Sequence, residues 1–192
     1  MFIIGILNLQ GAVSEHYDIT QKALENLNID GEARLVRYAD EVEDCDGIII
    51  SGGESTVIGK ILFERGIDKV IKNNNIPVFG TCAGMILLSS KTDYDQPIMS
   101  LMDIEVGRNA FGRQKDSFED TINILGYEYP GVFIRAPILK SYDDSKDDIE
   151  VLAEYDSKIV AIKQGKNLAM SFHPELTEDT RIHEYFINLI KN

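Results

Sequence analysis

The stretch from Ile76 to Ser90 constrains the fold more than any other part of the chain. A short apolar run leads into Gly80-Thr81-Cys82-Ala83-Gly84, and a helix-length apolar run follows directly. Small residues on both sides of one reactive side chain are typical of a sharp turn from a buried strand into a helix, because the strained backbone leaves no room for larger neighbours. The stretch therefore predicts a strand, a tight turn at Cys82, and a helix.

Cys82 is a candidate nucleophile because of its place in this turn. Its sulfur would lie at a helix N-terminus, where free N–H groups and the helix dipole favour the thiolate over the thiol. The alternative is a buried cysteine that packs as a small hydrophobic residue. The turn by itself does not decide between the two.

Strand-like and helix-like segments alternate through the first half of the chain. This alternation predicts a parallel sheet with helices on both faces, and near-continuous apolar runs such as Ile48-Ile49-Ile50 are expected of its central strands. The predicted strands are residues 3–9, 32–38, 46–50 and the run before Cys82. The predicted helices are one that begins at Ser14, with Tyr17, Ala23, Leu24 and Leu27 on its apolar face, and one over residues 56–72.

The second half of the chain has shorter strand candidates and more turns. Asp156-Ser157 and Gly165-Lys166-Asn167 supply turn chemistry between the last three of them, and Thr177 or Asp179 could cap a final helix. We expect residues 1–192 to form a single α/β domain with an antiparallel segment added in its second half. The strand candidates are residues 104–106, 117–124, 132–136, 149–155, 159–164 and 168–172.

Composition excludes several classes of function. The formal net charge of -13 argues against a nucleic-acid-binding surface and against an anionic membrane as partner. No apolar run approaches the roughly 18 residues that span a bilayer, and residues 1–7 lack the features of a signal peptide. The two cysteines make no disulfide framework, so a reduced, cytoplasmic setting is expected. The histidines and cysteines stand singly, so no metal site is expected.

A candidate base and its orienting group follow near the C-terminus, in Ser171-Phe172-His173-Pro174-Glu175. Pro174 favours extended backbone at His173, and residues two apart in extended chain face the same side. His173 and Glu175 should therefore project together, and the carboxylate would stabilise the imidazolium formed when a thiol gives up its proton. The alternative is a surface histidine beside a surface glutamate.

Gly52-Gly53 is the second candidate element. Adjacent glycines allow backbone that turns an N–H toward a ligand, so Gly53 could form an oxyanion hole together with the N–H of Ala83. Gly53 and Cys82 both lie just past strand ends, where the ligands of parallel sheets bind, so they can share one crevice. The alternative is a plain glycine-rich turn or, more weakly, a phosphate-binding loop.

Motifs spread over nearly the whole chain carry a family resemblance. The G-T-C-A-G turn at Cys82, S-G-G-E-S at residues 51–55 and F-H-P-E at 172–175 resemble a class I, triad-type glutamine amidotransferase. Four longer segments are similar to the glutaminase subunits of pyridoxal 5′-phosphate synthase. Ser51 departs from that family, which usually has proline there, and the change affects backbone stiffness rather than chemistry. The four segments are L-Q-G-A-V-S-E-H at 9–16, R-N-A-F-G-R-Q at 108–114, G-V-F-I-R-A-P at 131–137 and S-F-H-P-E-L-T at 171–177.

The resemblance implies a flavodoxin-like, three-layer fold and hydrolysis of L-glutamine to L-glutamate and ammonia. It places Cys82, His173 and Glu175 on the family's catalytic triad. Acidic and basic side chains also suit the charged ends of a free amino acid, although the alternative for the two arginines is a solvated or structural ion pair. The positions implied to contact glutamine are Gly53, Glu54, Ser55, Arg108, Ile134 and Arg135.

The resemblance also implies a partner, the synthase subunit that makes pyridoxal 5′-phosphate from a pentose phosphate and a triose phosphate. Pyridoxal phosphate is then the product of the complex, and no cofactor is expected in this chain. The turn at residues 10–16 is a candidate for sensing the partner, or else an ordinary helix entry. His16 and His183 are expected to be structural or surface residues.

Two other functions remain open. A glutaminase that serves another synthase, such as one for histidine or a nucleotide, would share the triad but should lack the segments at 9–16 and 108–114. A non-catalytic relative of the same fold, acting as a stress-response or binding module, would have no need for His173-Pro174-Glu175.

Overall fold

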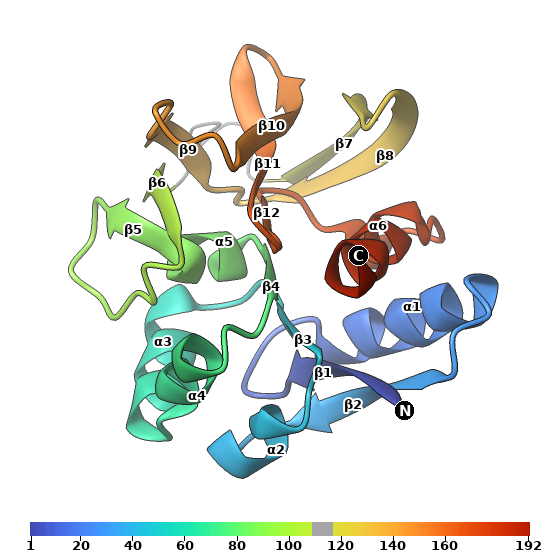
Figure 1. The fold of residues 1–192 in the computed structure, drawn as a ribbon. Coiled ribbons are helices and arrows are strands. Elements are labelled where there is room, and N and C mark those ends of the chain that lie inside the picture. Colours follow the sequence, from blue (N-terminus) through green and yellow to red (C-terminus); the bar gives the residue numbers. More distant parts are fainter. Residues whose placement is uncertain (109–116) are drawn as a thin grey trace.

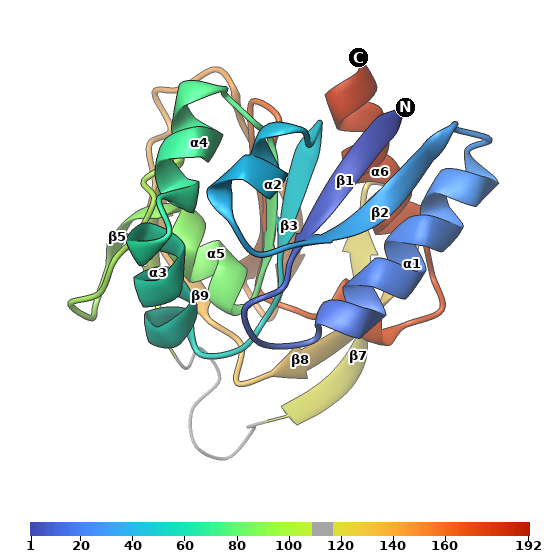
Figure 2. The same cartoon turned by 90° about the horizontal axis from the view of Figure 1, so that it is seen from below.

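The computed structural model describes residues 1–108 and 117–192, and its centre is a seven-stranded sheet with helices on both faces (Figures 1 and 2). The strand order is β10-β11-β12-β4-β3-β1-β2, with β12, β4, β3, β1 and β2 parallel and β10 and β11 antiparallel. This confirms the expected α/β class, and the order 2-1-3-4-12 of the parallel strands is that of a flavodoxin-like sheet. The strands are β1 (Phe2–Leu7), β2 (Gly31–Val36), β3 (Gly47–Ile50), β4 (Val78–Thr81), β10 (Ile149–Tyr155), β11 (Lys158–Gln164) and β12 (Asn167–Met170).

The central strands are buried on both faces, as parallel sheets require. In β1, Ile4 and Ile6 pack on the face covered by α1 (Val13–Asn26) and α6 (Arg181–Lys191). Ile3 and Leu7 pack on the opposite face, which α3 (Ser55–Glu64), α4 (Ile67–Asn73) and α5 (Ala83–Leu88) cover (Figure 1). The sheet therefore has one apolar core on each face, and the two sets of helices and the sheet between them form three layers.

The helices differ from the prediction in three places. The helix expected over residues 56–72 is two helices, because Gly66 lies between them in the left-handed conformation, with φ of 68°. A short helix, α2 (Ala39–Glu43), was not predicted; it is capped by Glu41, whose carboxylate accepts the N–H of Tyr38. The last helix begins at Arg181, with Thr180 rather than the predicted Thr177 or Asp179 at the N-cap position, although Asp179 does accept the N–H of Arg181.

The second half adds two small sheets. β7 (Ser117–Ile124) and β8 (Tyr127–Ile134) form an antiparallel hairpin, and β6 (Met102–Gly107) pairs with β5 (Ser89–Thr92) and β9 (Ile138–Tyr142). Strands β7 and β10 have the bounds that the sequence predicted. The strand predicted at 132–136 instead ends at Ile134, because Arg135 turns the chain with φ of 43°. Strands β5 and β9 were not predicted.

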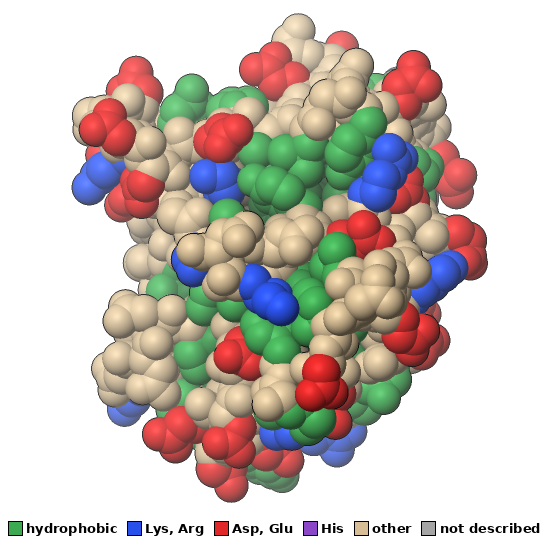
Figure 3. Space-filling view, turned by 45° about the vertical axis from the view of Figure 1, so that its right-hand side comes forward, with side chains coloured by type: hydrophobic (Ala, Val, Ile, Leu, Met, Phe, Trp, Pro, Cys, Tyr) green, Lys and Arg blue, Asp and Glu red, His purple; other side chains and the backbone are tan. Residues whose placement is uncertain are grey.

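The surface agrees with the acidic composition. Asp and Glu side chains are scattered over the face shown in Figure 3. Within the two described ranges, no helix has the length and apolar character to cross a membrane.

Candidate active site

The turn at Cys82 is built by backbone sterics. β4 ends at Thr81 and α5 begins at Ala83, so Cys82 caps the helix with φ of 50° and ψ of -104°, a conformation that is strained for any residue with a Cβ. A Cβ at Gly84 would collide with the carbonyl oxygen of Ile50, and one at Gly80 would collide with the backbone of Gly84. The predicted strand, tight turn and helix are confirmed, although the helix ends at Leu88.

His173 reaches Cys82 because β12 and β4 are neighbours. Met170 pairs with Thr81, and the Cys82 N–H donates to the carbonyl of Met170 at 2.8 Å. Three residues beyond Met170, the His173 N–H donates to the carbonyl of Val132 at 2.8 Å, which anchors the chain to β8. The parallel pairing therefore brings together two segments that are far apart in the sequence.

His173 and Glu175 lie together, as predicted, but for a different reason. His173 precedes a short 3₁₀ turn, η1 (Pro174–Leu176), so Glu175 does not follow in extended chain. The turn directs its carboxylate back at the imidazole, and Oε1 lies 2.7 Å from His173 Nδ1. Glu175 is buried, and His173 exposes only 7% of its surface.

The electrostatics favour a protonated His173. Burial by itself lowers the pKa of His173, but interactions with Cys82 and with the Glu175 carboxylate outweigh it and raise the pKa to about 10. Burial likewise raises the pKa of Glu175, while the nearby His16 and His173 outweigh it and hold that pKa below its usual value. The arrangement therefore suits an imidazolium between a thiolate and a carboxylate.

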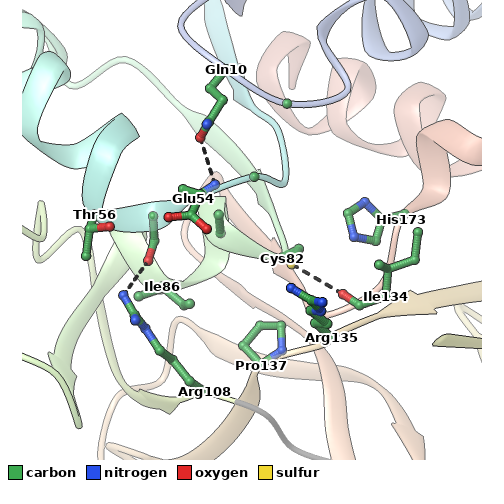
Figure 4. A pocket seen from close by; sticks show the side chains of 14 residues that line it. Gln10, Glu54, Thr56, Cys82, Ile86, Arg108, Ile134, Arg135, Pro137 and His173 are labelled. Carbon is green, nitrogen blue, oxygen red and sulfur yellow. Dashed lines mark hydrogen bonds between the residues drawn. The ribbon is translucent and has the colours of Figure 1, made fainter. Parts of the chain in front are cut away.

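Gly52 allows Cys82 and His173 to approach each other. A Cβ on Gly52 would collide with the His173 ring and would lie 3.3 Å from the Cβ of Cys82. Cys82 Sγ lies 3.8 Å from the carbonyl oxygen of Ile134, and in Figure 4 the His173 ring lies on the same side of Cys82 as that carbonyl. No described residue hydrogen-bonds His173 Nε2, so this nitrogen is available to exchange a proton with a group in the pocket.

The glycine-rich loop after β3 is tied to the loop after β1. The Glu54 N–H donates to Gln10 Oε1 at 2.8 Å, and Ser51 Oγ donates to the carbonyl of Gln10 at 2.9 Å. Ser51, which stands where the resembled family usually has proline, thus adds a hydrogen bond that proline could not make. Gly53 has φ of 144°, a conformation that only glycine adopts readily. Its role in an oxyanion hole stays a prediction.

One pocket of about 600 Å³ gathers the predicted site residues (Figure 4). All of them line it except Glu175, which lies behind His173. Five further residues line it that were not among the predicted contacts: Gln10, Gly11, Thr56, Ile86 and Pro137. The predicted lining residues are Gly53, Glu54, Ser55, Cys82, Ala83, Arg108, Ile134, Arg135 and His173.

The groups on the far side of the pocket from His173 are polar. Arg108 donates to Ser55 Oγ at 3.1 Å and to Gln96 Oε1 at 2.6 Å, and its guanidinium stacks on the Tyr94 ring at 4.3 Å. Ile134 turns its carbonyl to Cys82 while its side chain is partly exposed. An amino acid in this pocket could therefore meet a cation at one end and the Cys82 sulfur at the other.

The prediction that His16 is a structural or surface residue did not anticipate its contact with Glu175. Its Nε2 lies 3.3 Å from Glu175 Oε2, and its side chain is fully buried. The apolar face predicted for α1 was incomplete. Ala23 and Leu24 are buried as predicted, and Tyr17 and Leu27 are partly buried, but Ile19 and Thr20 are buried as well. Spacing of three and four residues back from Ile19 and Thr20 would have placed His16 on the buried face.

Comparison with known proteins agrees with this geometry. A model of the SNO glutamine amidotransferase family matches residues 6–192. The chain belongs to this family. A relative from Methanobrevibacter smithii, named pyridoxal 5′-phosphate synthase subunit PdxT, is 70% identical over 192 residues, covering all of this chain and 98% of the relative. A relative of the same name from Methanothermobacter thermautotrophicus is 55% identical with the same coverage.

A solved structure described as a glutamine amidotransferase is also similar, with a TM-score of 0.87 and 41% identity over 98% of this chain and 99% of that one. The SNO family membership confirms the resemblance drawn from the motifs at Cys82 and His173. Of the segment R-N-A-F-G-R-Q, only Arg108 can be placed, because the other six residues lie outside the described ranges. Among the residues that the structure describes, no group of three or more His, Cys, Asp or Glu could hold a metal ion.

Proposed function

We propose that this SNO-family chain hydrolyses L-glutamine to L-glutamate and ammonia, and passes the ammonia to the synthase subunit of a pyridoxal 5′-phosphate synthase. The observation that carries the proposal is the pocket in which Cys82 at a strained turn faces a His173–Glu175 pair. Both relatives compared above are named as subunits of that synthase rather than of another one. They are the reason to prefer this partner over a histidine or nucleotide synthase.

The first half-reaction is acyl transfer to sulfur. The Cys82 thiolate attacks the carboxamide carbon of glutamine, and the N–H groups of Ala83 and Gly53 hold the oxyanion that forms. His173 gives its proton to the departing nitrogen, the C–N bond breaks, and ammonia leaves a γ-glutamyl thioester on the sulfur. Glu175 keeps the His173 ring oriented and stabilises the imidazolium throughout.

The second half-reaction is hydrolysis of the thioester. His173, now neutral, takes a proton from a water molecule that attacks the same carbon. The C–S bond breaks, glutamate leaves, and the thiolate–imidazolium pair is restored. Since the pKa of His173 is raised to about 10, the imidazolium form of His173 is favoured at neutral pH.

The remaining pocket residues recognise the amino acid. Arg108 binds the α-carboxylate and Glu54 the α-ammonium group, on the side of the pocket opposite His173 (Figure 4). Ser55 accepts a hydrogen bond from Arg108 and so orients it. Ile134 contributes its backbone carbonyl, and Arg135 its partly exposed cation, at the edge nearest Cys82.

The broader setting follows from the same proposal. Residues 1–192 act as one glutaminase domain, the chain works in the cytoplasm, and it needs no cofactor because pyridoxal phosphate is made on the synthase. The turn at residues 10–16 senses the synthase, because Gln10 is hydrogen-bonded to the backbone of the glycine-rich loop. Docking at this turn could thereby change the oxyanion hole.

Glutamate release from glutamine tests the proposal, measured for the chain alone and mixed with the synthase subunit. We expect strong activation by the synthase and no turnover by Cys82→Ala. Cys45→Ala is the matched control, since Cys45 is buried, burial raises its pKa to about 11, and it lies outside the pocket. Substantial glutamate release by Cys82→Ala would overturn the assignment, and a Cys82 that alkylates without any turnover would favour the non-catalytic alternative.

A further inference from the structure

Two histidines outside the predicted triad lie behind Glu175. His16 of α1 and His183 of α6 are completely buried, and neither lines the pocket. His16 Nε2 lies 3.3 Å from Glu175 Oε2 and 3.1 Å from Thr81 Oγ1, while its Nδ1 lies 3.1 Å from His183 Nε2. Glu175 Oε1 in turn contacts His173. The side chains form an unbroken line from His183 to the imidazole beside Cys82.

Hydrogen-bond counting identifies which nitrogen of His16 carries the proton. Burial lowers the pKa of His16 and of His183, so both rings are neutral near pH 7 and each has a single N–H. With the proton on Nε2, His16 donates to Thr81 Oγ1 and turns the same N–H edge toward Glu175 Oε2, 3.3 Å away, while its bare Nδ1 accepts from His183 Nε2. Of the four nitrogens of these two rings, the one then left without a hydrogen-bond partner among the described residues is the bare Nδ1 of His183, an acceptor.

The reverse assignment leaves more groups unsatisfied. With its proton on Nδ1, His16 would donate to His183, which would have to carry its own proton on Nδ1, an atom with no hydrogen-bond partner among the described residues. The bare lone pair of His16 Nε2 would then lie 3.3 Å from Glu175 Oε2, which no described side chain hydrogen-bonds. A buried unpaired N–H and a lone pair turned toward a carboxylate oxygen cost more than one bare imidazole nitrogen.

We propose that His16 and His183 are positioning residues, which act through Glu175 on the His173 imidazole. The contacts run in one direction: His183 donates to His16, and His16 turns its Nε2–H edge toward Glu175 Oε2 at 3.3 Å. The other oxygen of that carboxylate, Oε1, receives the N–H of His173. This inference rests on the proposed function, since it takes His173 as the catalytic base. The pair thereby fixes both oxygens of Glu175 and holds the carboxylate in the plane that His173 needs.

A neutral donor suits this position better than a cation. Lysine or arginine at position 16 would neutralise Glu175 and weaken its support of the imidazolium, whereas imidazole solvates the carboxylate and leaves its charge intact. The described charged and titratable groups around His16 are Glu175 and His173 beyond β12, His183 on α6 and Glu15 on its own helix, while β4 contributes the Thr81 hydroxyl. No lysine or arginine is among them.

Nitrogen-15 NMR of the wild-type protein, labelled only at histidine, tests the direction of the contacts that run from His183 through His16 to Glu175. The protein has three histidines, so long-range ¹⁵N–¹H correlations give three ring patterns to assign. We expect His16 and His183 to be neutral near pH 7 and protonated on Nε2. A proton on Nδ1 of His16 would overturn the proposal. This readout needs no turnover, so it stands or falls separately from the glutaminase assignment.

Paired substitutions test the role. His16→Phe removes the donor and His16→Gln keeps one, because the glutamine amide reproduces the Nε2–H of histidine. We expect kcat in complex with the synthase subunit to fall about 10- to 100-fold in His16→Phe and KM to change little. His16→Gln should recover most of that loss. Equal losses in the two variants would overturn a donor role, and so would an unchanged kcat in His16→Phe.

The pH profile of Cys82 alkylation separates positioning from loss of folding. Without the His16 donor the Glu175 carboxylate protonates more easily, so the acid limb of the iodoacetamide reaction should move upward by about one pH unit in His16→Phe. A merely structural defect would lower the amplitude and leave the midpoint in place, which would overturn the proposal. If His16→Phe does not fold, the NMR experiment on the wild type still decides the question.

Discussion

The turn at Cys82 and the segment at His173 occupy equivalent places but are held in different ways. Each follows one of two neighbouring parallel strands, β4 and β12, which pair at Thr81 and Met170. Cys82 is fixed by the backbone, because Gly80 and Gly84 leave room for no side chain. His173 is fixed by buried polar groups, first of all Glu175.

The difference has physical consequences. Steric exclusion acts over one or two bond lengths, does not depend on pH, and is encoded by residues adjacent in the sequence. A buried hydrogen-bonded pair depends on protonation and on groups supplied by distant elements. Substitutions that add side-chain volume should therefore disturb the turn at Cys82 most, and substitutions that remove a charge should disturb the segment at His173 most.

Removal of the Glu175 charge should have the largest effect on turnover. Glu175→Gln keeps the shape of the side chain but removes the carboxylate that orients and stabilises the His173 imidazolium. We expect kcat/KM to fall about 100- to 10,000-fold. Glutamate release by the complex measures the effect. Loss of less than tenfold would mean that the segment at His173 does not depend on the buried charge.

Added volume at Gly84 should have the next largest effect, and on stability. Gly84→Ala would improve helix propensity, yet its Cβ collides with the Ile50 carbonyl. We expect a loss of about 3 kcal/mol, which is about 6–12 °C in melting temperature for a chain of this size. Gly126→Ala is the control, since a Cβ there meets nothing and only its φ of 82° is unfavourable, at about 1 kcal/mol. Equal losses in both variants would argue against steric control of the turn.

The pH dependence of stability should distinguish the two sides directly. The pKa of His173 is raised from 6.5 to about 10, so its stabilisation is fully present below pH 6.5 and is lost as the pH rises toward 10. The stability difference between the wild type and Glu175→Gln should therefore shrink over this range. The difference for Gly84→Ala should stay constant. Melting temperatures from pH 6 to 10 measure both, and a constant difference for Glu175→Gln would refute the raised pKa.

The same contrast explains how much could be predicted from the sequence. The Cys82 turn was predictable because its glycines are local, and the bounds of Ser117–Ile124 were predictable from its own residues. The proximity of His173 and Glu175 was predicted although their backbone is a 3₁₀ turn. The burial of His16 against Glu175 was not predicted, since no local pattern pairs α1 with a turn on the far side of the chain.

Local competition explains the misplaced elements. The apolar run after Cys82 suggests a longer helix. Instead, the Ser89 hydroxyl donates a hydrogen bond to the Ile86 carbonyl, and residues from Ser89 onward form strand β5, which pairs with β6. Gly66 is compatible with a helix in sequence but takes a left-handed conformation, which divides the helix expected there. In both cases a single residue ends the helix, and its effect depends on the packing that follows.

The smallest effect is expected at the substrate end of the pocket, where neither backbone sterics nor a buried charge dominates. Tyr94 is about half exposed, and its ring lies under the Arg108 guanidinium. Tyr94→Leu removes this cation–π contact, worth about 0.5–1 kcal/mol at an exposed site, so KM for glutamine should rise about two- to fivefold with kcat unchanged. Tyr94→Phe is the matched control because it keeps the aromatic face. A fall in kcat for Tyr94→Leu would show that Arg108 also positions the reacting amide, and the substrate end would then share the sensitivity of the His173 side.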